Sequence, residues 1–318
     1  MESPPVVTAT RGRGPVAGIV LLLVGLPLLL ALADAISYHR HNRNNGSLVS
    51  EGEVREYVLH VPRSFDPAKP TPLVISLHGA GSWPADQRDI SRWDALADRE
   101  GFMVVYPAGA GRIRSRIWHA DRGPGLARDV RFIADLIDTL QVAYNIDPAR
   151  VYVNGLSNGA GMAFVLSCTL ADRIAAVGLV ASALLLPWDW CPEDRPMPVI
   201  AFHGTADPIT PYHGGTTWVA SMAFPDVPTF VAAWARRNGC AATPHDSMVA
   251  PDVTLRAYAD ADCDAGVALY AVEDGGHAWP GGQPIPEWFA GPTSQSIDAT
   301  RLMWAFFRDR RLPGLRPK

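Results

Sequence analysis

The chain has 318 residues, of which 48% are hydrophobic, with 28 basic and 32 acidic residues and a formal net charge of −4. This length and composition support one large hydrophobic core, or at most two domains. The charges are spread along the sequence, and no basic run is long enough to indicate a nucleic-acid-binding protein. We therefore expect no nucleic-acid partner, and a substrate that is neutral or modest in charge.

An uncharged apolar run lies close to the N-terminus. A polar segment over 1–14 is followed by Pro15–Ala33, which as a helix would approach the ~30 Å of a bilayer core. Arg11 and Arg13 before the run, and small residues at its end, also fit a signal peptide over 15–35. A signal peptide and a membrane anchor both remain open. Both place the rest of the chain outside the cytoplasm, extracellular or periplasmic, and either secreted or tethered through residues 15–33.

The remaining chain alternates between apolar strand-like segments and amphipathic helical ones. The polar stretch 36–52 is interpreted as a linker, and a catalytic domain is expected over 53–318. The expected strands are Val54–Val61, Pro72–Leu77, Phe102–Tyr106, Val151–Val153, Ala175–Ala181, Pro198–Phe202, Val253–Tyr258 and Val267–Val272. The expected helices are Ile90–Arg99, Asp129–Tyr144, Gly161–Thr169, Thr229–Arg237 and Ser296–Arg308. This alternation predicts an α/β fold, with a doubly wound, mostly parallel sheet and helices on both faces.

A serine follows the expected strand at the centre of the chain. Gly155–Gly159 fit the pattern G-x-S-x-G and lie between the strand Val151–Val153 and the helix that follows. A serine on such a strand-to-helix turn is the nucleophile elbow of α/β-hydrolases. The pattern is short, so an ordinary glycine-rich turn is the alternative. We predict Ser157 as the nucleophile and the backbone N–H of Asn158 as an oxyanion-hole donor.

A nucleophilic serine needs a histidine base and a carboxylate that orients the base, and in this fold both follow the serine, the acid first. Asp207 lies just beyond an expected strand, and its alternative role is to form a turn before Pro208. Among the nine histidines, His277 is the best placed, in a glycine-rich loop that follows a strand. We predict Asp207 as the acid and His277 as the base. Asp274 is a second candidate acid, but it lies too close to His277 in the sequence.

The expected strand Pro72–Leu77 ends in the sequence His78-Gly79-Ala80-Gly81. A loop in this position supplies the second oxyanion-hole donor in α/β-hydrolases, and we predict the backbone N–H of Ala80 for that role. His78 is interpreted as a structural or pocket-lining residue. The alternative for the whole segment is a plain turn at the end of a strand.

Four cysteines are present, and export from the cytoplasm would favour disulfides. Four cysteines allow three connectivities, and free buried thiols are a further alternative. We favour the sequential pairs, which have equal spacing, Cys168–Cys191 and Cys240–Cys263.

No motif for a metal or a nucleotide is found. Asp260, Asp262 and Asp264 alternate as in a calcium loop, but Ala265 stands where that loop requires glycine. The phosphate-binding glycine patterns are also missing from the sequence. We therefore expect no cofactor and no metal.

Taken together, the strings LHGAG, GLSNGAGMA, HGTADPITPYHGG and GGHAWPGG resemble the secreted polyhydroxybutyrate-depolymerase/feruloyl-esterase group of α/β-hydrolases. The resemblance covers roughly 54–308 and implies a serine esterase with Ser157 as nucleophile, Asp207 as acid and His277 as base. It implies a substrate that is a polyester oligomer or an aryl or acetyl ester of a polysaccharide. Peptidase or acyltransferase action on the same fold, and a non-catalytic envelope binding protein, are the alternatives.

The resemblance also points to two tryptophans. Similar proteins often carry a tryptophan in the loop that matches Ala108–Arg128, so Trp118 is expected in the substrate pocket together with Trp279. For both residues, packing in the core is the alternative.

Overall fold

The computed structural model describes residues 25–41, 45–111, 116–192, 195–217, 220–258, 263 and 265–314. The chain divides into two units, Met1–His41 and Asn42–Lys318. In the first unit, the helix α2 covers Leu26–His41. None of the helices within these described ranges is both long enough and apolar enough to cross a membrane. Most of the predicted signal peptide or anchor over 15–35 lies outside the described residues.

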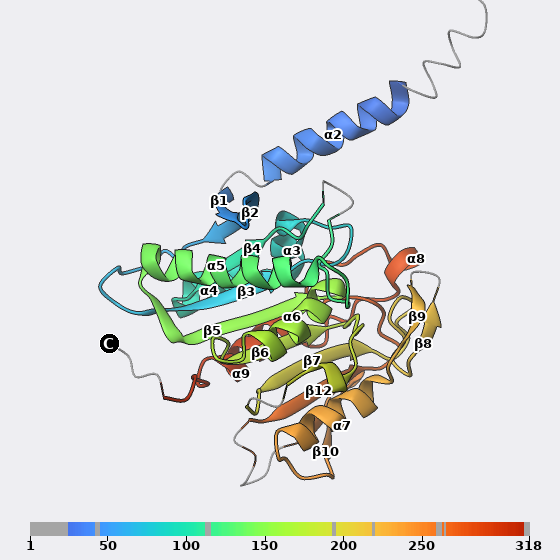
Figure 1. Cartoon of the computed structure of the whole chain (residues 1–318). Helices are drawn as coiled ribbons and strands as arrows, with labels where there is room; N and C mark the ends of the chain where they lie inside the picture. Colours follow the sequence, from blue (N-terminus) through green and yellow to red (C-terminus); the bar gives the residue numbers. More distant parts are fainter. Residues whose placement is uncertain are drawn as a thin grey trace, which may run out of the picture. The chain divides into compact units, whose positions relative to one another are not determined.

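The second unit is built on a ten-stranded sheet with the strand order β1-β2-β4-β3-β5-β6-β7-β12-β11-β10 (Figure 1). Its six central strands, from β4 to β12 in that order, run parallel, and the outer strands on each side are antiparallel. The strands are β1 Asn45–Ser50, β2 Glu53–His60, β3 Thr71–Leu77, β4 Met103–Pro107, β5 Ile146–Leu156, β6 Ala176–Val180, β7 Val199–Gly204, β10 His245–Ala250, β11 Val253–Tyr258 and β12 Val267–Val272. A separate hairpin pairs β8 Gly215–Thr217 with β9 Ala220–Phe224.

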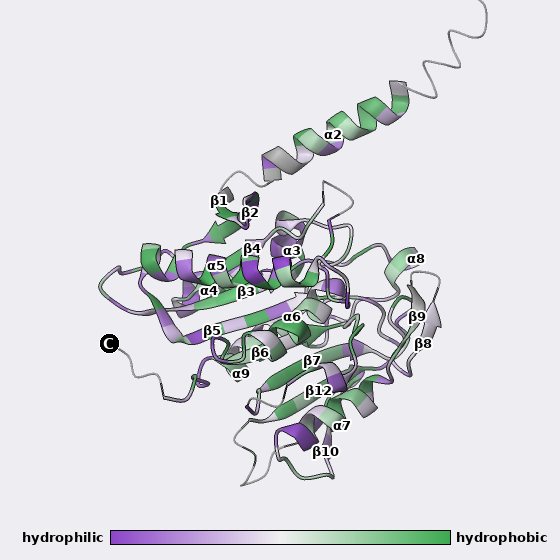
Figure 2. Ribbon diagram, viewed as in Figure 1, coloured by the Kyte–Doolittle hydropathy of each residue, from purple (hydrophilic) through white to green (hydrophobic). Residues whose placement is uncertain are grey.

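Helices cover both faces of this sheet, so the predicted doubly wound, mostly parallel fold is confirmed. The helices are α3 Pro84–Ser91, α4 Trp93–Glu100, α5 Leu126–Tyr144, α6 Asn158–Thr169, α7 Val227–Arg237, α8 Glu287–Ala290 and α9 Ala299–Phe307. One apolar cluster joins the sheet to α5, α6 and α7, and a second joins the other face to α4 and α9. Buried on both sides, the central strands are mostly hydrophobic, as Figure 2 shows for β7.

The predicted linker over 36–52 requires a correction. The helix α2 continues to His41, and β1 pairs with β2 in an antiparallel hairpin in which Ser50 and Glu53 form the pair next to the turn. The two turn residues Glu51 and Gly52 both have positive φ, 48° and 82°, as a two-residue hairpin turn requires. The folded unit therefore begins before residue 53.

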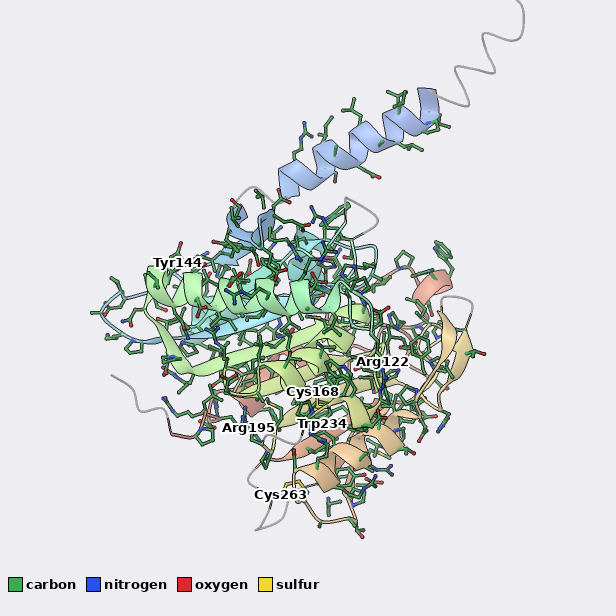
Figure 3. All side chains as sticks on the ribbon, in the orientation of Figure 1. Arg122, Tyr144, Cys168, Arg195, Trp234 and Cys263 are labelled. Atoms are coloured by element: carbon green, nitrogen blue, oxygen red, sulfur yellow. A yellow bond between two sulfur atoms is a disulfide. The ribbon has the colours of Figure 1, made fainter. Side chains whose placement is uncertain are left out.

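Two disulfides join the predicted pairs, Cys168–Cys191 and Cys240–Cys263 (Figure 3). Each closes a sequence separation of 23 residues. The first ties the end of α6 to the segment after the short 3-10 helix Trp188–Trp190, and the second ties the segment after α7 to the loop before β12. By loop-closure entropy, each bond stabilises the fold by about 3 kcal/mol.

Candidate active site

The predicted nucleophile lies on a strained turn between β5 and α6. Ser157 has φ 56° and ψ −118°, a backbone conformation that a residue other than glycine rarely adopts. The glycines on either side permit the turn. A Cβ on Gly155 would lie 2.4 Å from the backbone of Gly159, and a Cβ on Gly159 would lie 2.3 Å from the carbonyl oxygen of Leu77. The G-x-S-x-G pattern is therefore a packing requirement, because β3, β5 and α6 approach one another here without room for a side chain.

The predicted acid and base meet beyond the ends of two neighbouring strands. Asp207 follows β7, His277 follows β12, and these strands are paired in parallel. His277 Nδ1 lies 2.8 Å from Asp207 Oδ2. Both side chains are buried. Since the carboxylate can only accept, Nδ1 carries the proton and the Nε2 lone pair of neutral His277 is available as a base. Asp274, the second candidate acid, instead donates its backbone N–H to Thr205.

Thr210, which is not among the predicted site residues, holds the Asp207 carboxylate. Thr210 donates its Oγ1–H to Asp207 Oδ2 at 2.9 Å, and the backbone N–H groups of Ile209 and Thr210 both donate to Oδ1 at 2.8 Å. Burial alone would raise the pKa of Asp207, but hydrogen bonds from His203 and His277 outweigh it and hold that pKa far below its usual range. The carboxylate therefore stays ionised. Asp207 stands before Pro208, and an Asp in such a turn often accepts hydrogen bonds from the residues that follow it. This turn signal could have pointed to Thr210.

Ser157 and His277 open into a common cavity of about 460 Å³. Its wall is mostly apolar, and among the described residues the only ionisable side chains that line it are Asp86 and His277. Ser157 and His277 both line this cavity, and the hydrogen bonds found among the described residues do not include one between them. Catalytic hydrogen bonds are often long in a free enzyme and tighten when substrate binds.

Two backbone N–H groups border the cavity beside the serine. Asn158 is the first residue of α6, so its N–H has no partner inside the helix. Ala80 lies in the loop after β3, and both residues line the cavity that also contains Ser157. The structure thus brings the two predicted oxyanion-hole residues to the same cavity wall as the serine.

His78 does not line the cavity, which corrects its predicted place in the substrate pocket. Its side chain is fully buried, with Nε2 accepting a hydrogen bond from the Gly109 N–H at 2.9 Å and Nδ1 2.8 Å from the Gly79 carbonyl oxygen. Burial lowers the pKa of His78 to about 4, so the ring is neutral and its single proton is on Nδ1. In a trans peptide the N–H points away from the C=O. By holding the Gly79 carbonyl, His78 fixes the direction of the Ala80 N–H.

Trp118 is also buried and does not line the cavity, so the core-packing alternative holds for it. Its ring packs against Phe132 of α5 and against His78. Its backbone is bound by the Asn158 side chain, since Trp118 N donates to Asn158 Oδ1 at 2.7 Å and Asn158 Nδ2 donates to Trp118 O at 2.9 Å. The loop that carries Trp118 is thus hydrogen-bonded to the residue that follows the nucleophile.

Trp279 also does not line the cavity, which corrects its predicted place in the substrate pocket. Its side chain is completely buried in the cluster beneath α4 and α9, and its indole Nε1 donates to Thr300 Oγ1 at 2.9 Å. It anchors the His277 loop to α9, away from the cavity. The aromatic residues that line the cavity are Phe224 of β9 and Phe289 of α8. The sequence carried no signal for them, because long segments without strong periodicity bring both to the site.

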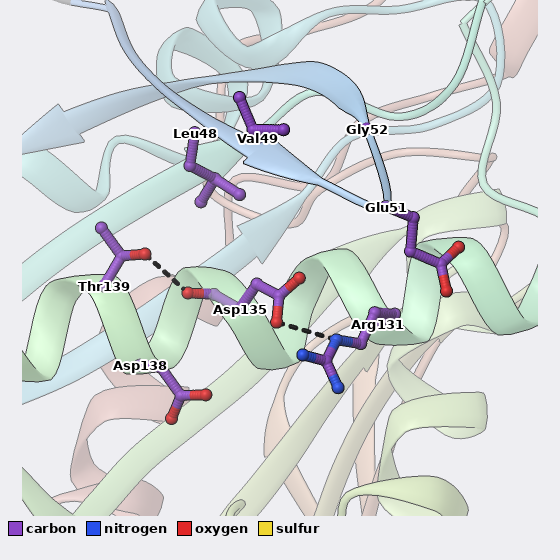
Figure 4. Close-up of a pocket in the computed structure, with 8 residues that line it drawn as sticks. All are labelled: Leu48, Val49, Glu51, Gly52, Arg131, Asp135, Asp138 and Thr139. Atoms are coloured by element: carbon purple, nitrogen blue, oxygen red, sulfur yellow. Dashed lines mark hydrogen bonds and ion pairs between the residues drawn. The ribbon is translucent and has the colours of Figure 1, made fainter.

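A larger groove of about 600 Å³ lies between the β1–β2 turn and α5 (Figure 4). Its polar groups bind one another: Arg131 pairs with Asp135 at 2.9 Å, and Thr139 donates to the Asp135 carbonyl oxygen at 2.8 Å. None of the described residues that form its wall is a serine or a histidine. The chemistry is therefore assigned to the smaller cavity.

The alternating aspartates Asp260, Asp262 and Asp264 lie outside the described residues. Among the residues that are described, no group of three or more His, Cys, Asp or Glu side chains is arranged to hold a metal ion.

Comparisons with known proteins give the chain a family. A sequence profile described as esterase PHB depolymerase matches residues 56–263. Feruloyl esterase B of Piromyces equi is 28% identical over 230 residues, which cover 70% of this chain and 42% of that protein. Feruloyl esterase C of Emericella nidulans is 29% identical over 236 residues, which cover 70% of this chain and 79% of that protein. The chain thus spans less than half the length of feruloyl esterase B.

A solved structure supports the fold independently. The acetyl xylan esterase from Aspergillus awamori superposes with a TM-score of 0.59 and 14% identity, covering 82% of this chain and 98% of that one. This likeness shows the α/β-hydrolase fold. With a profile match that runs from β2 to the second disulfide and includes Ser157 and Asp207, the chain belongs to the esterase PHB depolymerase family.

Proposed function

We propose that the chain is a serine-dependent carboxylic ester hydrolase that acts through an acyl-enzyme. One observation carries the proposal: His277 is bound through Nδ1 to an ionised, buried Asp207, and it shares a cavity with a serine on a strained turn. This arrangement leaves His277 Nε2 as the base for the Ser157 hydroxyl.

The reaction follows from these positions. His277 Nε2 takes the Ser157 proton while Oγ attacks the ester carbonyl, and the Ala80 and Asn158 N–H groups stabilise the oxyanion. His277 then gives that proton to the leaving alcohol, the ester C–O bond breaks, and an acyl-serine remains. Water, deprotonated by His277, attacks the acyl-serine, which releases the acid and restores the serine. Asp207 stabilises the imidazolium at both steps.

The substrate class rests on the cavity wall and on the family. The described part of the wall carries one carboxylate and no lysine or arginine, which favours an uncharged ester over an anionic one. Relatives are named feruloyl esterases, and the structural neighbour is named an acetyl xylan esterase. We therefore propose an aryl or acetyl ester of a polysaccharide, or a polyester oligomer.

We further propose that the enzyme acts outside the cytoplasm, in the periplasm or extracellular space. Two disulfides support this location, because they persist in oxidising compartments, and the uncharged run Pro15–Ala33 supports export. The test is protease accessibility and mass of the mature protein in cell fractions, which separates a cleaved signal peptide from a retained tether.

The function itself is tested with Ser157→Ala on chromogenic short-chain esters, followed by a panel of feruloyl, acetyl-xylan and hydroxybutyrate esters. We expect the rate of ester hydrolysis to fall by about 10⁴-fold or more in Ser157→Ala, without a change in thermal midpoint. Full hydrolysis by Ser157→Ala would contradict it. Adding peptides and acceptor alcohols to the panel separates ester hydrolysis from peptidase and acyltransferase action.

A further inference from the structure

The most exposed aromatic side chain of the described residues lies beside the catalytic cavity. Trp288 of α8 is 88% exposed, whereas its neighbour Phe289 lines the cavity wall. The two rings are 5.9 Å apart, centre to centre. A tryptophan is large and costly to leave in water, and such a residue at the edge of a binding site marks a contact surface.

The backbone that carries Trp288 is fixed against the catalytic base. The His277 N–H donates to the Ala290 carbonyl oxygen at 2.6 Å, and the Gly276 N–H donates to Pro292 O at 2.8 Å. A Cβ on Gly276 would lie 2.1 Å from Ala290 O, so the two segments approach too closely for a side chain. Ala290 itself is fully buried. Trp288 is therefore held on a short, anchored turn and is not carried by a free loop.

The chemistry gives this side of the cavity a role. In the mechanism proposed above, His277 protonates the leaving alcohol, so the alcohol part of the ester lies next to His277. The α8 turn is hydrogen-bonded to that histidine's own backbone and supplies Phe289 to the wall. An alcohol part next to His277 therefore lies on the side of the cavity that α8 borders.

We propose that Trp288 is a binding subsite for the alcohol part of the substrate, and that it stacks on an uncharged ring. A cavity of about 460 Å³ accepts an acyl group but not a polymer chain, so the alcohol part must continue over the rim. Asp86, a carboxylate in the wall, disfavours an anionic alcohol. The face of an indole binds flat rings, whether a sugar ring or an aryl ring. The inference rests on the proposed esterase function and adds the place where the alcohol is recognised.

The test uses three esters of one acid, chosen as the acid whose methyl ester the wild-type enzyme cleaves fastest. The alcohols are methanol, benzyl alcohol and the primary hydroxyl of a methyl arabinofuranoside. All three form the same acyl-enzyme, and kcat/KM covers only the steps up to its formation, so differences in kcat/KM report binding and acylation. The variants are Trp288→Ala, Trp288→Phe as the conservative replacement, and Met248→Ala as a matched control. Met248 is an equally apolar side chain, 76% exposed on the edge strand β10.

Trp288→Ala should lower kcat/KM about 3- to 10-fold for a ring-bearing ester and less than 2-fold for the methyl ester, with Trp288→Phe in between. The ring that loses more identifies the alcohol as glycosyl or aryl. An equal effect on all three esters, or none on the ring esters, overturns the subsite while the esterase function stands. The subsite is equally overturned if wild-type enzyme cleaves only the methyl ester. If wild-type enzyme cleaves no ester of any acid tested, the proposed function fails as well.

Discussion

The Asn158 side chain binds the backbone of Trp118 on both of its polar groups, accepting from N at 2.7 Å and donating to O at 2.9 Å. All four atoms are buried. The residue that follows the nucleophile therefore lines the cavity, where we propose its backbone N–H as an oxyanion donor, and its side chain joins the nucleophile turn to the loop that carries Trp118.

Replacing Asn158 with alanine separates these tasks, because the backbone N–H remains. The buried Trp118 N–H then loses its partner, while the Trp118 C=O loses one of two and still accepts from the Ala120 N–H. Leaving the N–H unpaired costs roughly 1–3 kcal/mol of unfolding free energy. We expect kcat/KM to fall about 10-fold as the turn loosens. Urea unfolding and ester kinetics measure the two effects. Gln295→Ala removes one partly buried hydrogen bond of an exposed side chain and should change stability by less than about 1 kcal/mol. Equal losses of stability in Asn158→Ala and Gln295→Ala would contradict the proposed role of the Asn158 side chain.

Asp207→Asn tests the orientation of the base. Asparagine still accepts from the backbone N–H groups of Ile209 and Thr210, but its amide can present a donor to His277, which moves the imidazole proton to Nε2. We expect kcat to fall by roughly 10³–10⁴-fold with little change in thermal midpoint. Asp274→Asn is the matched control, because Asp274 contacts Thr205 through its backbone, and its activity should be unchanged. A larger loss in the control would reassign the acid.

Gly159→Ala tests the packing of the nucleophile turn. The added methyl would lie 2.3 Å from Leu77 O and 2.6 Å from His78 O, both backbone atoms that cannot move aside cheaply. We expect a loss of folded yield, or a fall in thermal midpoint with little activity left. Gly266→Ala is the control, because its methyl would meet only the end of the Arg310 side chain at 3.3 Å. A stable, active Gly159→Ala enzyme would contradict the packing account.

His78 makes a prediction about pH and stability. Its ordinary pKa of ~6.5 applies in the unfolded chain, and burial lowers it to about 4 in the fold. The unfolded state therefore binds the proton first, so the stability from His78 is complete above pH ~6.5 and is lost as pH falls toward 4. The loss amounts to roughly 3 kcal/mol. His78→Gln should flatten this part of the unfolding free-energy profile, whereas His245→Gln, at an exposed position, should not. An unchanged slope in His78→Gln would contradict the assignment.

Much of the fold was predictable because the central strands are buried on both faces and appear as short apolar runs. The predicted strands Val253–Tyr258 and Val267–Val272 coincide with β11 and β12. The helix expected over Ile90–Arg99 is instead two helices, α3 and α4, because Arg92 between them has φ 57°. The edge strands β1 and β10 were not predicted, because half-exposed strands lack a continuous apolar run.

The catalytic residues could be predicted from the sequence more easily than the residues that line the cavity. Ser157, Asp207 and His277 each follow a strand, and parallel strands bring such residues to one edge of a sheet. The pocket residues could not be predicted, because an aromatic residue in a loop carries no signal of burial. Trp118 and Trp279 are buried in the core, while Phe224 and Phe289 line the cavity.

Whether Ser157 is the reactive nucleophile is decided by mass spectrometry of the enzyme after reaction with a fluorophosphonate. We expect one adduct, on the peptide that contains Ser157, formed in proportion to the loss of esterase activity. We expect no adduct in Ser157→Ala, and labelling at least about 10³-fold slower in His277→Ala. An adduct on another residue, or full activity in completely labelled enzyme, would contradict this assignment.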